Sequence, residues 1–191
     1  MNRIIASILG LCSSANASAQ DFVFFAGFES QLQPVAGSVI VDEIMSNPEL
    51  VADNVGEWFE FTNVSTQSVE LNNCLIGNGT TQNTLPAHSL SSGGYAVMAR
   101  NLDTSTNGGV SAFASFTFSL PASGTIILTC GSRSIDQVSW TSELAGHSRS
   151  LDPAHLDAIA NDNPANWCFS TMLFNASDFG TPNFVNESCP P

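Results

Sequence analysis

The feature that most constrains the fold is a succession of short apolar runs from Ser38 onward, each ended by turn-forming residues. No segment has the long 3.6-residue periodicity of a helix, and the runs have the length of strands. In one run, Phe116, Phe118 and Leu120 alternate with serine and threonine, as expected of a strand with one buried face. The candidate strands are Val39–Met45, Glu57–Asn63, Val69–Ile76, Tyr95–Arg100, Phe113–Leu120, Thr125–Cys130 and Ser134–Trp140. This pattern predicts an all-β fold, a mainly antiparallel β-sandwich of about 7–9 short strands, with Phe59, Phe61, Phe116 and Phe118 inside.

The first 19 residues have the pattern of a secretory signal peptide. Arg3 supplies positive charge, residues 4–11 form a short apolar run, and Ala17-Ser18-Ala19 is an A-x-A cleavage site before Gln20. The alternative is a buried first strand or helix. The apolar run is shorter than the roughly 20 residues that span a bilayer. We therefore expect an exported chain, secreted, periplasmic or at the cell surface, with no transmembrane segment after cleavage.

The length and composition fit one domain with short extensions. The chain has 191 residues, of which 43% are hydrophobic and 11% charged, which favours a globular fold over disorder. We expect a leader or linker over residues 20–37, with an added edge strand as the alternative. The sandwich domain is then expected over residues 38–186, followed by a C-terminal tail over residues 187–191.

Four cysteines remain once the predicted signal, which contains Cys12, is removed. An even number in an exported chain predicts two disulfides, with three pairings open. We prefer Cys74–Cys130, which would tie two strands of the sandwich, and Cys168–Cys189, which would close a C-terminal segment rich in turn residues. No C-x-x-C or other zinc spacing is present.

The charge balance is strongly acidic. The chain has 17 aspartates and glutamates, and the predicted mature part has three arginines and no lysine. Nucleic-acid binding depends on Lys and Arg contacts to phosphates. We therefore expect no direct nucleic-acid partner.

Several motifs resemble, in the same order, those of bacterial lamin tail domains. Residues 39–63, VIVDEIMSNPELVADNVGEWFEFTN, are similar to the family's "NEIM-NP" strand, variable loop and "EWIEL-N" strand. SGGYAVMARN resembles "GGYLVLARN", FSLPASGTIILTC resembles "FSLSNSGETITLTD", IDQVSW resembles "VDSVSYG", and NWCFS with FGTPNFVN resembles "NW…GTPGAPN". Thr62 departs from the Tyr often found at the end of the second strand, and the cysteines belong to a subset of exported members. The resemblance implies an immunoglobulin-like sandwich that serves as a non-catalytic binding or surface-association module.

Glu43 and Glu60 stand at positions that the family usually fills with glutamate. Two carboxylates on neighbouring strands could form a metal site or an acid–base pair. The favoured alternative is a structural role, in which they accept hydrogen bonds from loop amides and hold the loop Asn47–Gly56. Asp42 and Glu43 are adjacent on a strand, so we expect them to point to opposite faces.

The segment Ser150–Cys168 gathers side-chain oxygens as calcium loops do. These are on Asp152, Asp157, Asn161, Asp162 and Asn163. The segment lacks the EF-hand spacing, and its Asx-Pro steps equally well begin turns in which Asp and Asn cap neighbouring amides. Calcium bound by Asp152, Asp157 and Asp162 is thus one hypothesis, and turn capping is the other.

No catalytic motif is present, since the three histidines are scattered and there is no H-E-x-x-H, G-x-S-x-G or P-loop. Trp58, Trp140 and Trp167 fit either a carbohydrate-stacking platform or, more commonly, packing in the core. The sequence favours an exported non-catalytic module without a resident cofactor, whose partner is a protein or cell-envelope ligand. The alternative function is a calcium-dependent accessory subunit or hydrolase that uses the segment from Asp152 to Asn163.

Overall fold

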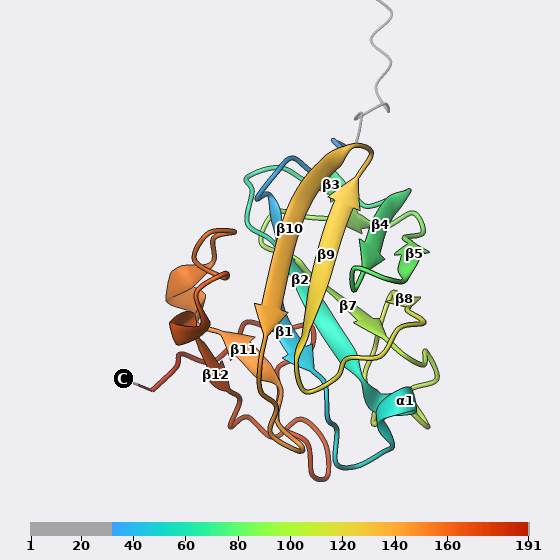
Figure 1. Cartoon of the computed structure of the whole chain (residues 1–191), viewed down its shortest axis with the longest axis vertical. Helices are drawn as coiled ribbons and strands as arrows, with labels where there is room; N and C mark the ends of the chain where they lie inside the picture. The colour runs from blue at the N-terminus through green and yellow to red at the C-terminus, as the bar shows by residue number, and fades with distance from the viewer. Residues whose placement is uncertain (1–31, 191) are drawn as a thin grey trace, which may run out of the picture. The chain divides into compact units, whose positions relative to one another are not determined.

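Two sheets pack against each other in the part of the chain that the computed structural model describes, residues 32–190 (Figure 1). The six-stranded sheet has the order β12 (Trp167–Phe169), β11 (Arg149–Leu151), β1 (Val39–Met45), β2 (Trp58–Asn63), β7 (Tyr95–Ala99) and β8 (Ala114–Ser115). The four-stranded sheet has the order β10 (Arg133–Trp140), β9 (Gly124–Cys130), β4 (Cys74–Gly77) and β5 (Gln82–Thr84). A small pair consists of β3 (Val69–Glu70) and β6 (Ser89–Leu90), and the helical turns are α1 (Asp53–Gly56), η1 (Pro153–His155) and η2 (Pro164–Asn166). The pairing is antiparallel except between β7 and β8.

This architecture confirms the predicted all-β sandwich, but the strand number was wrong. Residues 32–190 contain twelve strands. The predicted run Val69–Ile76 is divided between β3 and β4, and the predicted run Phe113–Leu120 contributes only the two residues of β8. The strands β5, β6, β11 and β12 were not predicted, because two or three residues are too few to show an alternating pattern.

The predicted signal peptide and most of the predicted leader, residues 1–31, lie outside the described residues, as does Pro191. The described end of the predicted leader contacts the sandwich, since Leu32 forms a parallel bridge with Val69 and the Gly37 amide donates to the Ile135 carbonyl at 2.8 Å. No helix in residues 32–190 is long and apolar enough to cross a membrane.

The four phenylalanines expected inside the sandwich lie between its sheets. Ring centroids of Phe59 and Phe116 are 4.9 Å apart and those of Phe116 and Phe118 are 4.8 Å apart, and Phe61 packs edge-on against Phe59 at 5.4 Å. All four are buried. Such aromatic pairs add to the stability that comes from the buried area itself.

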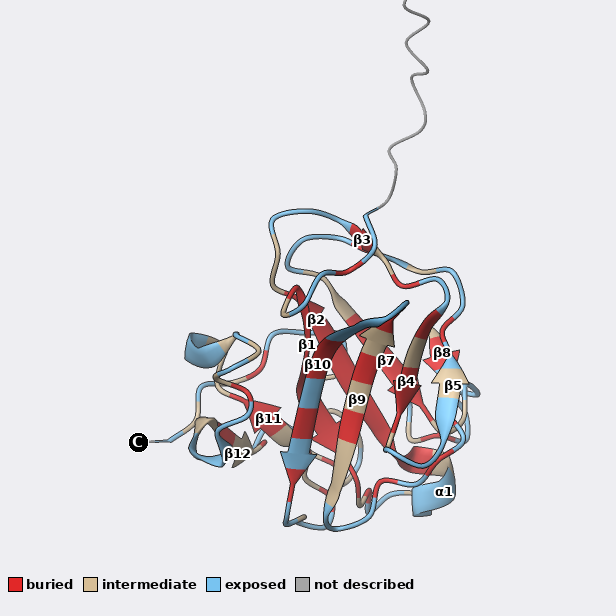
Figure 2. Cartoon of the chain, turned by 45° about the horizontal axis from the view of Figure 1, so that its top comes forward, coloured by how far each residue is buried: buried red, intermediate tan, exposed pale blue. Residues whose placement is uncertain are grey.

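The outer face of the six-stranded sheet is also covered, so that β1 and β2 are buried along their whole length (Figure 2). Met45, Trp58 and Val97 form a second apolar cluster on this face. Phe174, from the segment 172–186, packs edge-on against Trp58 with the ring centroids 6.0 Å apart. We call residues 172–186 the cover segment. Because of this cover, polar side chains on the outer face of β1 and β2 are buried as well.

β1 pairs with β11 only at Glu43 and Ile44. Beyond this pairing, side chains form the hydrogen bonds to the β1 backbone that a neighbouring strand would otherwise form. The Val41 amide donates to Asp136 Oδ2 at 2.8 Å, and Asn161 Nδ2 donates to the Val41 carbonyl at 3.3 Å. Asn186 Nδ2 donates to the Asp42 carbonyl at 2.9 Å. These contacts satisfy buried backbone groups that would otherwise lack a partner.

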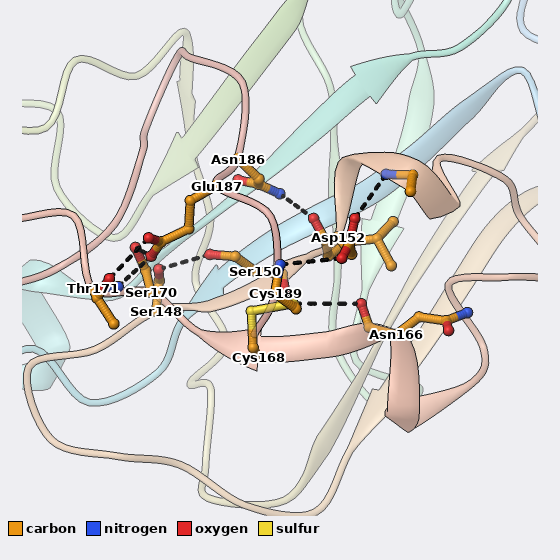
Figure 3. The surroundings of a disulfide bond; sticks show 12 residues. Ser148, Ser150, Asp152, Asn166, Cys168, Ser170, Thr171, Asn186, Glu187 and Cys189 are labelled. Atoms are coloured by element: carbon orange, nitrogen blue, oxygen red, sulfur yellow. Dashed lines mark hydrogen bonds between the residues drawn. A yellow bond between two sulfur atoms is a disulfide. The ribbon is translucent and has the colours of Figure 1, made fainter. Parts of the chain in front are cut away.

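Two disulfides have the pairing preferred from the sequence. Cys74 and Cys130 are opposite each other on β4 and β9, with Cα atoms 4.2 Å apart. Cys168 on β12 is bonded to Cys189, with Cα atoms 5.6 Å apart (Figure 3).

The end of the chain, expected to be a tail, is attached to the sandwich by more than its disulfide. The Cys189 amide donates to Asp152 Oδ2 at 3.1 Å, and Glu187 accepts hydrogen bonds from Ser170 Oγ and from the amide and hydroxyl of Thr171 (Figure 3).

Candidate functional site

A β-bulge in β1 brings three acidic side chains together. The register places Val41 opposite Phe61 and Glu43 opposite Glu60, so that Asp42 is the extra residue of the bulge. The bulge removes the strict alternation on which the sequence prediction for Asp42 and Glu43 relied. Both carboxyl groups lie close enough to Glu60 to raise its pKa. The expectation that Asp42 and Glu43 point to opposite faces relied on that alternation, and the charges of both contribute to the pKa of Glu60.

Glu43 is completely buried and accepts hydrogen bonds with both carboxyl oxygens. Its Oε1 accepts from the hydroxyls of Ser148 and Ser150, at 2.5 and 2.9 Å, and from the Thr181 amide at 2.9 Å. Its Oε2 accepts from the Thr181 hydroxyl at 2.9 Å. Glu43 thereby joins β1 to β11 and to the cover segment.

Glu60 holds the next part of the cover segment. Its Oε2 accepts a hydrogen bond from the Asn183 amide at 2.5 Å. Asn183 has a φ of 71°, a left-handed conformation that asparagine tolerates better than most residues. Its side chain donates to the Ser111 carbonyl at 2.9 Å, which joins the cover segment to the loop before β8.

Gly180 gives the cover segment its close approach to the sheet. A Cβ atom at this position would lie 3.0 Å from Cζ2 of Trp58 and 3.2 Å from Oε1 of Glu43. Few side-chain contacts are this short, so a larger residue would push the segment outward or displace the Glu43 carboxylate.

Burial without a counter-charge raises the pKa values of all three acids. Burial raises the pKa of Glu60 to about 11, with further contributions from the charges of Asp42 and Glu43. Burial, followed by the charge of Glu43, raises the pKa of Asp42 well above its usual value. Neither Asp42 oxygen has a hydrogen-bond partner within residues 32–190, and nor does Oε1 of Glu60. The one salt bridge in the described structure, Arg100–Glu57, does not involve this cluster.

Like charges so placed cannot all ionise, so the Asp42–Glu60 pair retains a proton at neutral pH. Burial also raises the pKa of Glu43, but the hydrogen bonds from Ser148, Thr181 and Ser150 oppose the shift. The carboxyl groups of Glu43 and Glu60 accept hydrogen bonds from the backbone amides of Thr181 and Asn183. Their chemistry is therefore that of hydrogen-bond acceptors that hold a segment in place.

Glu43 and Glu60 accept hydrogen bonds from backbone amides, but these amides belong to a different segment from the predicted one. The two glutamates bind the cover segment and not the loop Asn47–Gly56. That loop is held by Asp178, whose Oδ1 accepts from the amides of Glu49 and Leu50 at 2.6 and 3.3 Å. The sequence carries no signal for these contacts, which join residues more than 120 positions apart.

A groove of about 460 Å³ lies over these carboxylates. It is lined by residues 172–174 and 180–185 of the cover segment, with Gly109 and Ser111 from the facing loop. Four of its apolar side chains are more than half exposed, with Phe184 at 71%. These four are Met172, Leu173, Phe184 and Val185. Phe184 directly follows Asn183, whose amide donates to Glu60, and the Thr181 amide, two residues before Asn183, donates to Glu43.

Two of the three aspartates of the calcium hypothesis, Asp152 and Asp157, cap turns. Asp152 Oδ1 accepts from the Ala154 amide at 2.8 Å, and Asp157 Oδ1 accepts from the Ile159 amide at 2.8 Å. Asn163 Oδ1 likewise accepts from the Ala165 amide. Within residues 32–190 no three His, Cys, Asp or Glu side chains are grouped as a metal site would need. Calcium at Asp152, Asp157 and Asp162 stays a prediction.

The three tryptophans considered as a carbohydrate platform are buried, with exposed fractions of 1% for Trp58, 5% for Trp140 and 8% for Trp167. They pack within the fold and do not form an exposed stacking platform. Two histidines stack on aromatic rings, His147 on Phe179 with centroids 4.4 Å apart and His88 on Phe113 at 4.2 Å.

Comparison with known proteins adds no relative. No protein-family model matches the chain, and no curated protein is significantly similar to it in sequence.

Proposed function

We propose that this chain is an exported, non-catalytic binding or surface-association module of the lamin tail type, and that it binds its partner in the groove of the cover segment. The order of the lamin-tail motifs supports the family, and a β-sandwich with two disulfides is consistent with it. Disulfides of this kind persist in oxidising compartments, which supports export.

The observation that carries the binding function is the combination of a fixed backbone with exposed apolar side chains. Isolated exposed apolar residues are common on protein surfaces. Here Leu173 and Phe184 line one groove together, and hydrogen bonds to Glu43 and Glu60 hold its floor. A preformed apolar groove with polar groups at its base is the usual form of a binding site.

The chemistry of the groove favours an apolar, uncharged or cationic segment of a protein partner. None of the residues that line it is charged, and the chain as a whole has a net charge of −13. Nucleic acids and anionic lipid surfaces are repelled by such a charge. A short apolar peptide segment meets no such repulsion.

Photo-crosslinking in cell envelopes tests this proposal directly. A photoreactive phenylalanine analogue at Phe184 is expected to form one dominant protein adduct. Ile159 is a matched control, since it is apolar and 83% exposed but does not line the groove. The same analogue at position 159 should give no such adduct. Equal crosslinking from both positions, or none from position 184, would contradict the proposal.

A defined probe gives an independent readout. A neutral apolar dye such as Nile red should bind the secreted chain, and Phe184→Ser should weaken that binding by several fold. Ile159→Ser should leave the binding unchanged. Both side chains are exposed, so neither variant should change the unfolding midpoint appreciably.

A further inference from the structure

A second pocket, distinct from the groove, lies where β10 ends and β11 and β12 begin. Its volume is about 320 Å³, within the range of small-molecule sites. Polar groups come from Arg149 and from the hydroxyl residues Ser139, Thr141 and Ser142, and apolar surface comes from two tryptophans and a proline. The complete lining is Ser139, Trp140, Thr141, Ser142, Arg149, Pro164 and Trp167.

Arg149 is held in this pocket by groups that leave its charge uncompensated. One nitrogen, Nη2, donates to the hydroxyl of Ser142 at 2.5 Å and to its carbonyl at 3.4 Å. The guanidinium carbon lies 5.1 Å from the centroid of the Phe169 ring. No carboxylate within residues 32–190 forms a salt bridge with Arg149.

The missing counter-charge is notable in so acidic a chain. The sequence has 17 acidic residues, yet none lines this pocket. A partly buried cation is costly unless it is paired. The overall negative charge does not prevent an anion from binding here, because charges beyond about 8 Å are largely screened at physiological ionic strength.

The walls of the pocket are fixed by contacts that do not use Arg149. The Trp140 indole donates to the Pro121 carbonyl at 2.9 Å, and the Trp167 indole donates to the Asn161 carbonyl at 2.7 Å. The site is therefore formed before a ligand binds. This lowers the cost of ordering it on binding.

We propose that this pocket binds a small hydroxylated carboxylate, such as a uronic acid, with Arg149 as the anchor of the carboxylate. Nη2 of Arg149 is engaged by Ser142 and Nε is buried, so the group left to donate to a carboxylate is Nη1. A hydrogen bond from a charged guanidinium to a carboxylate is charge-assisted and stronger than one between neutral groups. Thr141 and Ser142 line the same pocket and supply hydroxyl groups for hydrogen bonds to those of such a ligand, while the Ser139 hydroxyl donates to Thr125 Oγ1 at 3.2 Å. Trp140 and Trp167 supply apolar surface.

Titration of the secreted chain with glucuronate, followed by NMR of the tryptophan indole groups, tests the assignment. Saturable shifts of the Trp140 and Trp167 signals are expected below about 20 mM, since a single charge-assisted anchor gives millimolar affinity. Glucose lacks the carboxylate and should give no saturable shift. Acetate should bind more weakly than glucuronate, because it has no hydroxyl groups.

Variants of Arg149 separate a binding role from a structural one. Arg149→Gln should weaken glucuronate binding at least about tenfold, the factor that corresponds to one charge-assisted hydrogen bond. Arg149→Lys keeps the charge but cannot contact Ser142 and a ligand carboxylate with separate nitrogens, so it should bind glucuronate more weakly than the wild type. If Arg149→Gln does not fold, Arg149→Lys is the variant that tests the assignment. Arg133→Gln, which changes an arginine outside the pocket, is the matched control and should bind as the wild type does.

Three results would overturn the assignment. These are no saturable shift with glucuronate, equal binding of glucose, or unchanged glucuronate binding by the folded variants of Arg149. Phe184→Ser should not affect glucuronate binding. The titration therefore tests this site independently of the function proposed for the groove.

Discussion

Replacement of Glu60 by glutamine should remove part of the pH dependence of folding stability. Glu60 is fully buried, and its pKa rises from an ordinary value of 4.5 to about 11 in the folded chain. Between these values the folded state binds more protons than the unfolded state. The free energy of unfolding must therefore fall as the pH rises.

The size of the effect follows from this difference in proton binding. Each pH unit above 4.5 costs about 1.4 kcal/mol while Glu60 keeps its proton. At pH 8 the accumulated cost is at most about 5 kcal/mol, and relaxation around the buried pair with Asp42 will reduce it. Glu60→Gln keeps an oxygen that can accept from the Asn183 amide but has no proton to lose.

Urea unfolding at pH 5, 6, 7 and 8, followed by tryptophan fluorescence, measures this difference. The free energy of unfolding of Glu60→Gln should fall less steeply with pH than that of the wild type, and the variant should be the more stable at pH 8. A shallower but nonzero slope should remain, because burial also raises the pKa of Asp42 and raises that of Asp136 to about 6. Glu49→Gln, at an exposed position, is the control and should follow the wild type. Parallel curves for Glu60→Gln and the wild type would refute the reasoning.

Three further outcomes are expected. Removing Cys74–Cys130 by serine substitution should cost about 4 kcal/mol, and removing Cys168–Cys189 about 3 kcal/mol, because the first closes 56 residues and the second 21; equal losses in denaturant unfolding would argue against loop closure as the cause. Gly180→Ala should lower the unfolding midpoint and speed amide exchange in the cover segment, since its Cβ would lie only 3.0 Å from Trp58 and 3.2 Å from Glu43, which must then shift; an unchanged midpoint would show that the segment can shift freely. The purified chain without residues 1–19 should not be retained on duplex DNA at physiological salt with chelator present, and retention there would revive a nucleic-acid function.

The sequence predicted those parts of the fold that local patterns determine. The bounds of β1 were predicted as observed, and the hairpin of β9 and β10 was predicted within one residue. The two cysteine pairs followed from an even count and from where the strands lie. Phe116 and Phe118 were placed correctly in the core although their run is not a strand, because alternation reports burial and not hydrogen bonding.

The site depends on features that local patterns do not carry. The bulge at Asp42 changes which side chains share a face, and nothing in VIVDEIM marks it. The contact between Glu60 and Asn183 joins residues 123 positions apart, and the turn residues around Asn183 predict a turn without saying where it docks. In the segment after Ser150 the sequence does carry a pattern, but the pattern has two meanings. Turn capping and metal binding both use Asp and Asn oxygens, so the residue types do not distinguish them.

Site-resolved amide hydrogen exchange at Thr181 and Asn183 tests the central claim most directly, since these are the two amides of the groove lining that donate to Glu43 and Glu60. Both amides are expected to exchange slowly, with opening free energies well above those of surface loops. The Asn183 amide should lose protection in Glu60→Ala, which removes its acceptor. Exchange of both amides in the wild type at the rate of an unstructured peptide would contradict the account.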